Sequence, residues 1–238
     1  IPESELPALQ KFIPSLALCR QLIVVVTKDW EKVPGMLYRF ERDGEGWQLH
    51  QAPWPVVVGR NGMGWGIGDH GGPPKNAERL KREGDGRAPA GIFRLDEAFG
   101  KVPAGISEIT RFPYRQMLPT TRGVDDPRSR FYNRVINAAH VGEEDWQSAE
   151  IMLRKDNLYD WGIVVRHNWK PYPGYGSCIF LHIWRGPRVG TAGCTAMREK
   201  RMVSLARWLD SRLKPLLIQL PRNEYAKLED QWQLPALK

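Results

Sequence analysis

Short apolar runs separated by turn residues dominate the first quarter of the chain and predict β-strands. The longest run, Leu22–Val26, has the length of a strand and is far shorter than the ~20 residues of a membrane-spanning helix. Strands are predicted over 21–28, 35–43, 46–51 and 53–59, with residues 42–46 as a hairpin turn. A short helical piece near residues 9–18 precedes them.

Two further strands and the clearest helix are predicted in the last hundred residues. The segments 159–167 and 178–184 have the apolar character of buried strands, whereas 148–154 is expected to form a short helix. After Cys194, apolar residues recur at helical spacing until Pro215 ends the pattern. The helix is therefore expected to begin at Cys194. Its apolar positions are Met202, Leu205, Ala206, Leu209 and Leu213.

The composition is that of a globular protein with many turns. Hydrophobic residues make up 42% and charged residues 26%, which excludes wholesale disorder, while 23 Gly and 19 Pro argue against a helical bundle. No repeat or low-complexity linker divides the chain. We expect a mostly β, sandwich-like domain with a few short helices over 21–214, an N-terminal extension over 1–20 and a C-terminal tail over 215–238.

The net charge of +8 favours anionic partners, such as nucleic acid, acidic lipid or an anionic wall polymer. The basic residues are scattered and lack an aromatic stacking motif, which argues against nucleic acid. The chain shows no transmembrane segment. It has no HExxH motif and no CxxC pair, and we expect neither a metal nor another cofactor. It begins Ile1-Pro2 without Met, and a trimmed N-terminus is expected.

The segment that ends at Cys194 carries the candidate chemistry. His182 lies near the end of a predicted strand, and a short loop leads from it to Gly193 and Cys194. An imidazole can take the thiol proton, and the N-terminus of a helix would stabilise a thiolate. Gly193 allows a carbonyl to approach, and neighbouring N–H groups would hold an oxyanion. The alternative is an inert buried cysteine beside a core histidine.

Two motifs resemble the L,D-transpeptidase catalytic domain (YkuD) family. His182 followed by Thr191-Ala192-Gly193-Cys194 is similar to its signature of a strand histidine, a loop and Ser/Thr-x-Gly-Cys. Upstream, 83–93 resembles the family's x-T-P-x-G-x-F strand entry. The resemblance covers residues 21–214. It implies a β-sandwich, in which one of the few short helices follows the catalytic cysteine.

The resemblance implies acyl transfer on peptidoglycan tetrapeptide stems. Cys194 would attack the L,D-amide before the terminal D-alanine, with His182 as general base and then acid, and Gly193 and Thr191 near the oxyanion. An amine acceptor gives transpeptidation, and water gives L,D-carboxypeptidase action; a catalytically silent wall-binding domain is the other alternative. Stem peptides are the expected partners, no cofactor is needed, and a periplasmic or cell-envelope location is implied.

The sequence departs from the family after the cysteine. Many members carry an arginine there that is thought to hold the substrate carboxylate, but this chain has Thr195-Ala196. The short loop between His182 and Cys194 implies a reduced lid. His167 is a candidate for the groove, although a surface position is favoured. The candidate replacements for the arginine are Arg185, Arg188 and Arg198.

Three other features leave alternatives open. The mixed-charge segment 81–87 is either a solvated turn or, if the resemblance holds, a part of the catalytic face. Glu150 is either the buried partner of an arginine or a surface acid. The periplasmic setting and the three cysteines imply a disulfide between Cys19 and Cys178, with Cys194 as the working thiol.

Overall fold

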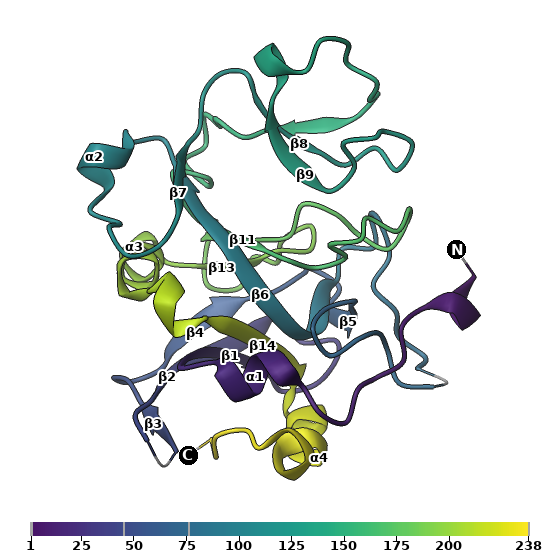
Figure 1. Cartoon of the computed structure of the whole chain (residues 1–238), viewed down its shortest axis with the longest axis vertical. Helices are drawn as coiled ribbons and strands as arrows, with labels where there is room; N and C mark the ends of the chain where they lie inside the picture. Colours follow the sequence, from purple (N-terminus) through teal and green to yellow (C-terminus); the bar gives the residue numbers. More distant parts are fainter. Residues whose placement is uncertain (1, 45, 76, 238) are drawn as a thin grey trace.

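Eight strands of the chain close into a ring of hydrogen-bonded neighbours (Figure 1). The computed structural model describes residues 2–44, 46–75 and 77–237. The ring consists, in spatial order, of β1 (Gln21–Thr27), β14 (Leu216–Pro221), β6 (Ala88–Gly100), β11 (Trp161–Val165), β12 (Phe180–Ile183), β13 (Thr195–Met197), β4 (Trp54–Val57) and β2 (Pro34–Arg42). Because β2 also pairs with β1, the predicted mostly β, sandwich-like fold is confirmed in a closed, barrel-like form.

Short strands and helices are attached to this barrel. β3 (Trp47–Leu49) extends β2, while β5 (Met63–Trp65) and β7 (Tyr114–Gln116) pair with β6. The helical elements are α1 (Pro14–Leu18), α2 (Ala104–Ser107), α3 (Glu199–Trp208) and α4 (Arg222–Trp232), with 3-10 turns η1 (Glu3–Glu5), η2 (Ala138–His140) and η3 (Ser211–Leu213). Within the described ranges, no helix combines the length and apolar character needed to cross a membrane.

The main core fills the inside of the ring, and β1 is one of its fully buried strands. All seven residues of β1 are buried, because the strand pairs on both sides and α4 packs against it. Such a strand is apolar on both faces, which explains the unbroken run Leu22–Val26. The helix α4 buries the side chains of Tyr225, Leu228 and Trp232.

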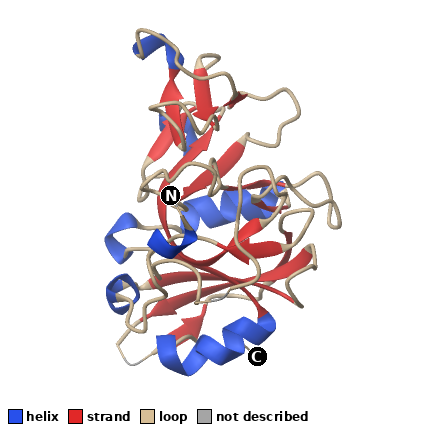
Figure 2. Ribbon diagram, turned by 90° about the vertical axis from the view of Figure 1, so that its right-hand side faces the viewer, coloured by secondary structure: helices blue, strands red, loops and turns tan. Residues whose placement is uncertain are grey.

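A second, three-stranded sheet covers one outer face of the barrel. It consists of β8 (Thr121–Val124), β9 (Arg134–Asn137) and β10 (Ala149–Ile151), with β8 in the middle. Figures 1 and 2 both place this small sheet at the end of the molecule opposite α4. A separate buried cluster fills the space between the small sheet and the barrel; its members are Phe99, Met117, Met152, Tyr159, Cys178, Phe180 and Cys194.

Most of the predicted strands are found in the barrel. The segments predicted over 21–28, 35–43, 46–51 and 53–59 are β1, β2, β3 and β4, with ends shifted by at most two residues. The predicted hairpin is also present, because Arg42 pairs with Trp47 and Phe40 with Leu49. Its turn contains residue 45, which lies outside the described residues. The strands over 159–167 and 178–184 are β11 and β12.

Three predicted elements are corrected by the sheet pairing. The segment 148–154 contains strand β10 rather than a helix. The helix expected at Cys194 begins only at Glu199, because residues 195–197 are needed as the extended partner of β12. Residues 215–238, expected to form a tail, contribute α4 and also β14, which lies between β1 and β6 in the barrel. The helical piece near 9–18 is confined to α1.

The predicted disulfide between Cys19 and Cys178 is wrong. All three cysteines are free, and the two residues lie in different hydrophobic clusters. The Cys19 thiol donates to the carbonyl oxygen of Gln21 at 2.9 Å in the main core, whereas the Cys178 thiol faces the carbonyl of Val124 on β8. Each thiol is thus satisfied locally, and burial raises the pKa of Cys19 to about 12.

The central position of β14 predicts a large cost for truncating one of its side chains. Ile218 is fully buried in the main core, so Ile218→Ala is expected to lower the free energy of unfolding by about 3 kcal/mol. Urea denaturation followed by circular dichroism measures this loss. Ile106→Ala, which truncates an exposed isoleucine, is the matched control and should change stability little. Equal small effects for both variants would contradict the central role of β14.

Candidate active site

The parallel pairing of β12 with β13 brings His182 and Cys194 to neighbouring strands. Leu181 pairs with Thr195 and His182 with Ala196, which continues the register to Phe180 beside Cys194. Side chains alternate between the two faces of a strand, so His182 shares one face with Phe180. The same alternation directs Leu181 into the main core. The thiol sulfur of Cys194 lies 3.3 Å from the backbone nitrogen of Phe180, which donates to it.

Tyr159 confirms that the two candidate residues face the same space. Its ring packs edge-on against His182 with centroids 5.2 Å apart, and against Phe180 at 5.6 Å. Tyr159 also belongs to the buried cluster that contains Cys194. The imidazole and the thiol therefore both lie between the barrel and the small sheet.

The backbone fixes the tautomer of His182. Its Nδ1 lies 2.7 Å from the carbonyl oxygen of Ile183, and a carbonyl oxygen only accepts hydrogen bonds. Nδ1 must therefore carry the proton, which leaves the lone pair of a neutral ring on Nε2. Burial lowers the pKa of His182 to about 4. The ring is thus a neutral base at ordinary pH, with its basic nitrogen directed away from Ile183.

Cys194 rests as a protonated thiol. The residue is 7% exposed, and burial raises the pKa of its thiol to about 12. The charge of Glu150 raises this pKa further, whereas the Phe180 N–H group and the charge of Lys81 lower it. The expected helix N-terminus does not contribute, because Cys194 leads into β13. The Cys194 thiol and the His182 imidazole are therefore both neutral at rest.

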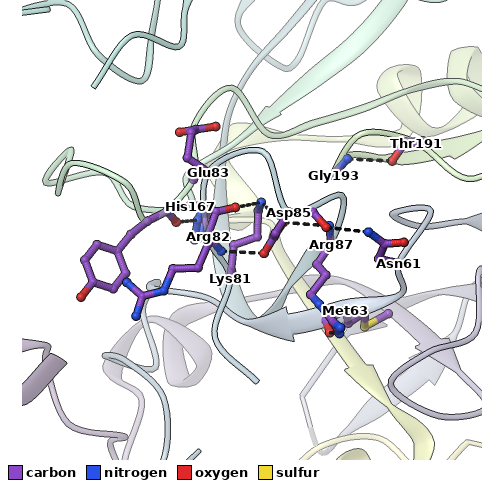
Figure 3. Close-up of polar contacts among 12 residues, drawn as sticks. Asn61, Met63, Lys81, Arg82, Glu83, Asp85, Arg87, His167, Thr191 and Gly193 are labelled. Carbon is purple, nitrogen blue, oxygen red and sulfur yellow. Dashed lines mark hydrogen bonds and ion pairs between the residues drawn. The ribbon is translucent and has the colours of Figure 1, made fainter. Parts of the chain in front are cut away.

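Thr191 holds the turn that precedes the cysteine. Its hydroxyl accepts a hydrogen bond from the Gly193 N–H group at 3.1 Å (Figure 3). The same hydroxyl donates to the carbonyl of Cys194 at 2.6 Å. The Gly193 N–H group is thus already engaged and does not serve as an oxyanion donor in this conformation. We therefore give Thr191 a role in positioning Cys194.

The candidate arginines lie away from the sulfur. Arg185 is exposed and forms an ion pair with Asp156 at 3.4 Å. The charge of Arg185 also lowers the pKa of His182. Arg188 is exposed on the loop after β12, and Arg198 is the exposed residue that precedes α3. None of the contacts recorded for the described residues joins these three side chains to Cys194.

His167 is buried rather than on the surface, and it lines a cleft of about 480 Å³, as the groove alternative expected. Its Nδ1 accepts from the Ile67 N–H group at 3.3 Å, and its Nε2 lies 2.8 Å from the carbonyl oxygen of Tyr175. Burial and the nearby charge of Lys81 lower the pKa of His167 to about 3. Because both ring nitrogens are engaged with backbone groups, we do not include His167 in the proposed site.

The pair of Tyr159 and Glu150 was missed by sequence reasoning. The Tyr159 hydroxyl donates to Oε2 of Glu150 at 2.5 Å and so joins the dyad region to strand β10. Burial raises the pKa of Glu150. Its partner is a tyrosine instead of the arginine considered from the sequence. The wrong helix prediction for 148–154 concealed this contact, because it placed Glu150 on a different kind of surface.

A cleft of about 480 Å³ leads from the surface towards this cluster. It shares Cys178 and Phe180 with the cluster, and Trp169 is half exposed at its rim. The small sheet lies over the buried cluster that contains Cys194, and the expectation of a reduced lid stays a prediction. The charged side chains that line the cleft are Asp96, Glu97, Arg115, Arg134 and Arg166.

The chain belongs to the L,D-transpeptidase catalytic domain (YkuD) family, whose sequence model matches residues 24–218. The predicted resemblance to this cysteine-dependent, peptidoglycan-modifying enzyme family is thereby confirmed.

A comparison with solved structures finds the helical cell shape determining protein Pgp2 (K307A mutant) from Campylobacter jejuni. The identity is 14% and the TM-score 0.42, over 92% of this chain and 56% of that chain. This chain therefore spans little more than half the length of that protein. No curated protein matches the sequence.

The neutral resting pair predicts how the thiol reacts with pH. Below the pKa of about 12, the thiolate fraction rises about tenfold per pH unit, so alkylation of Cys194 by iodoacetamide should rise without a plateau from pH 6 to 10. Peptide mass spectrometry of the native protein measures the rate at Cys194 separately from Cys19 and Cys178. A plateau near pH 7 would instead indicate a thiolate–imidazolium pair.

The raised pKa of Glu150 predicts that ionisation of this residue destabilises the fold. Stability is lost as pH rises from the unfolded-state pKa, about 4.3, through the raised folded-state pKa. Glu150→Gln, which cannot ionise, should therefore be more stable than wild type at pH 8 and similar to it at about pH 4. Thermal unfolding at both pH values measures this, with the exposed Glu143→Gln as control. A loss of stability of Glu150→Gln relative to wild type at pH 8 would contradict the raised pKa of Glu150.

Proposed function

We propose that the protein is a cysteine-dependent acyl transferase that acts on the L,D-amide of peptidoglycan tetrapeptide stems. The observation that supports this most directly is the placement of His182 on β12 and of Cys194 directly before its parallel partner β13, with His182 Nδ1 held by the Ile183 carbonyl. That hydrogen bond leaves Nε2 as the base for the thiol. Family membership supplies the substrate class.

In the first half of the reaction, the Cys194 sulfur attacks the carbonyl carbon of the amide that joins the diamino acid to the terminal D-alanine. The thiol proton moves to Nε2 of His182, and a tetrahedral oxyanion forms. The carbon–nitrogen bond then breaks as the imidazolium returns the proton to the leaving amine. D-Alanine departs, and the acyl group remains on sulfur as a thioester.

In the second half, an acceptor attacks the thioester and His182 removes its proton. An amine of another stem gives a cross-link, and water gives L,D-carboxypeptidase action; in both cases the sulfur leaves and regains a proton. The charges in the cleft suit such substrates, because stem peptides carry carboxylates and an amine, and the cleft presents both cations and acids. We infer from this substrate class a periplasmic or cell-envelope location.

We infer that substrate approaches the sulfur from the cleft that Phe180 lines, although neither Cys194 nor His182 lines that cleft itself. Cys194 is buried between the two sheets, so the stem must enter where the cleft meets the buried cluster. The dry surroundings strengthen electrostatic interactions between protein and substrate once water is excluded. The same burial explains why the thiol is not ionised before substrate arrives.

Incubation with purified tetrapeptide muropeptides, followed by mass spectrometry, tests this proposal. Loss of D-alanine alone indicates hydrolysis, and a joined dimer indicates transpeptidation. Cys194→Ala should abolish both products, because it removes the nucleophile, whereas Cys178→Ala, which removes a buried thiol beside it, should retain turnover. An unchanged substrate with wild-type protein, or turnover by Cys194→Ala, would contradict the proposed function and leave a wall-binding domain as the alternative.

A further inference from the structure

A buried lysine lies beside the loop that carries Cys194 and has no part in the steps described above. Lys81 is 3% exposed, and lysine is rarely so buried unless it is paired. Its ammonium forms an ion pair with Asp85 Oδ1 at 2.6 Å and donates to the carbonyl of Arg82 (Figure 3). Lys81 therefore does not belong to a solvated turn, which was one of the two interpretations of segment 81–87.

Asp85 shares its negative charge with the backbone as well as with Lys81. The Arg82 N–H group donates to its Oδ2 at 2.6 Å, and the Arg87 N–H group donates to its Oδ1 at 2.8 Å. A carboxylate that is already stabilised by two backbone donors neutralises a neighbouring ammonium less completely. The same hydrogen bonds hold the ion pair in one place. Lys81 is thus a fixed cation whose field extends beyond Asp85.

That cation faces the peptide of Gly193 and Cys194. A Cβ atom built on Gly193 would lie 3.7 Å from the Lys81 Nζ and 3.1 Å from the carbonyl oxygen of Arg87. Because Gly193 has no side chain, nothing of its own separates the ammonium from the loop. The aliphatic part of the Lys81 side chain packs against Gly176, which precedes β12. His182 lies within β12, two residues after Phe180, whose N–H group contacts the sulfur.

Among the described residues, the cation whose charge acts on the pKa of Cys194 is Lys81. Arg154, in contrast, lies over the Tyr159 ring at 5.1 Å and acts on the pKa of His182. Glu150 and Tyr159 approach from the small-sheet side, and both are acids. Cys178 and His182 approach from β12, and burial keeps the imidazole neutral at ordinary pH. The field of Lys81, in contrast, lowers the pKa of Cys194. Lys81 thus acts against the effects of burial and of Glu150.

We propose that Lys81 is a positioning residue that stabilises the negative charge on the Cys194 sulfur during attack. It fills the role that sequence analysis gave to the N-terminus of a helix. The inference rests on the proposed function, because it takes Cys194 as the nucleophile. Lys81 transfers no proton: the thiol proton still passes to His182, and the ammonium remains paired with Asp85.

The pH profile of Cys194 alkylation tests this inference without any substrate. In Lys81→Met the rate with iodoacetamide at pH 8 should fall about tenfold, the order expected for removing a unit charge several ångströms away. Asp85→Asn removes the opposing charge and should raise the rate. Lys81→Arg keeps the charge and should remain closer to wild type than Lys81→Met. Peptide mass spectrometry assigns each rate to Cys194, with Cys194→Ala as the blank.

Opposite shifts in Lys81→Met and Asp85→Asn separate electrostatics from folding. A loosened loop would expose Cys194 in both variants and change both rates in the same direction, which would overturn the inference, as would unchanged rates in both. Circular dichroism checks each fold, and Asp85→Asn carries the test if Lys81→Met does not fold. Opposite shifts without muropeptide turnover by wild type would refute the proposed function alone, whereas turnover without them would refute the role of Lys81 alone.

Discussion

The parallel pairing of β12 with β13 is the constraint on which the candidate site depends. It requires Thr195–Met197 to be extended, and it sets Cys194 beside Phe180 while His182 stays two residues further along the neighbouring strand. The short connection between the strands is held by Thr191, which bonds to both Gly193 and Cys194. The cysteine therefore has a strand, not a helix, on its C-terminal side. Activation of the thiol must come from side chains and individual backbone groups rather than from a helix dipole.

Burial by the small sheet determines the charge state of this site. It raises the pKa of Cys194 and lowers the pKa of His182, so both groups rest neutral. A neutral thiol and a neutral imidazole have a smaller desolvation cost than a buried ion pair. They therefore stay neutral until the thiol proton is transferred during attack on the substrate. In such dry surroundings a single charge has a large effect. This explains how Lys81, on a loop of another part of the chain, can influence the sulfur.

The small sheet also links the cover of the site to its chemistry. Strand β10 contributes Glu150, whose hydrogen bond with Tyr159 connects the cover to the ring that packs on His182. Tyr132, which follows β8, donates in the same way to Glu83 of the loop that carries Lys81. Two tyrosine–glutamate contacts thus join the cover to both sides of Cys194. A shift of the small sheet would move acidic groups relative to the thiol as well as open the cleft.

Local sequence determined the early strands and the family, because short apolar runs and the Thr-x-Gly-Cys pattern depend on neighbours in the chain. Tertiary structure decided the rest. The helical periodicity after Cys194 is real in α3, but pairing with β12 keeps its first residues extended. Lys81 belongs to a segment whose mixed charges are typical of a solvated turn, and only the folding of that turn against Gly176 and Gly193 buries it. Contacts between residues about a hundred positions apart leave no periodic pattern, so no reading of local spacing could assign them.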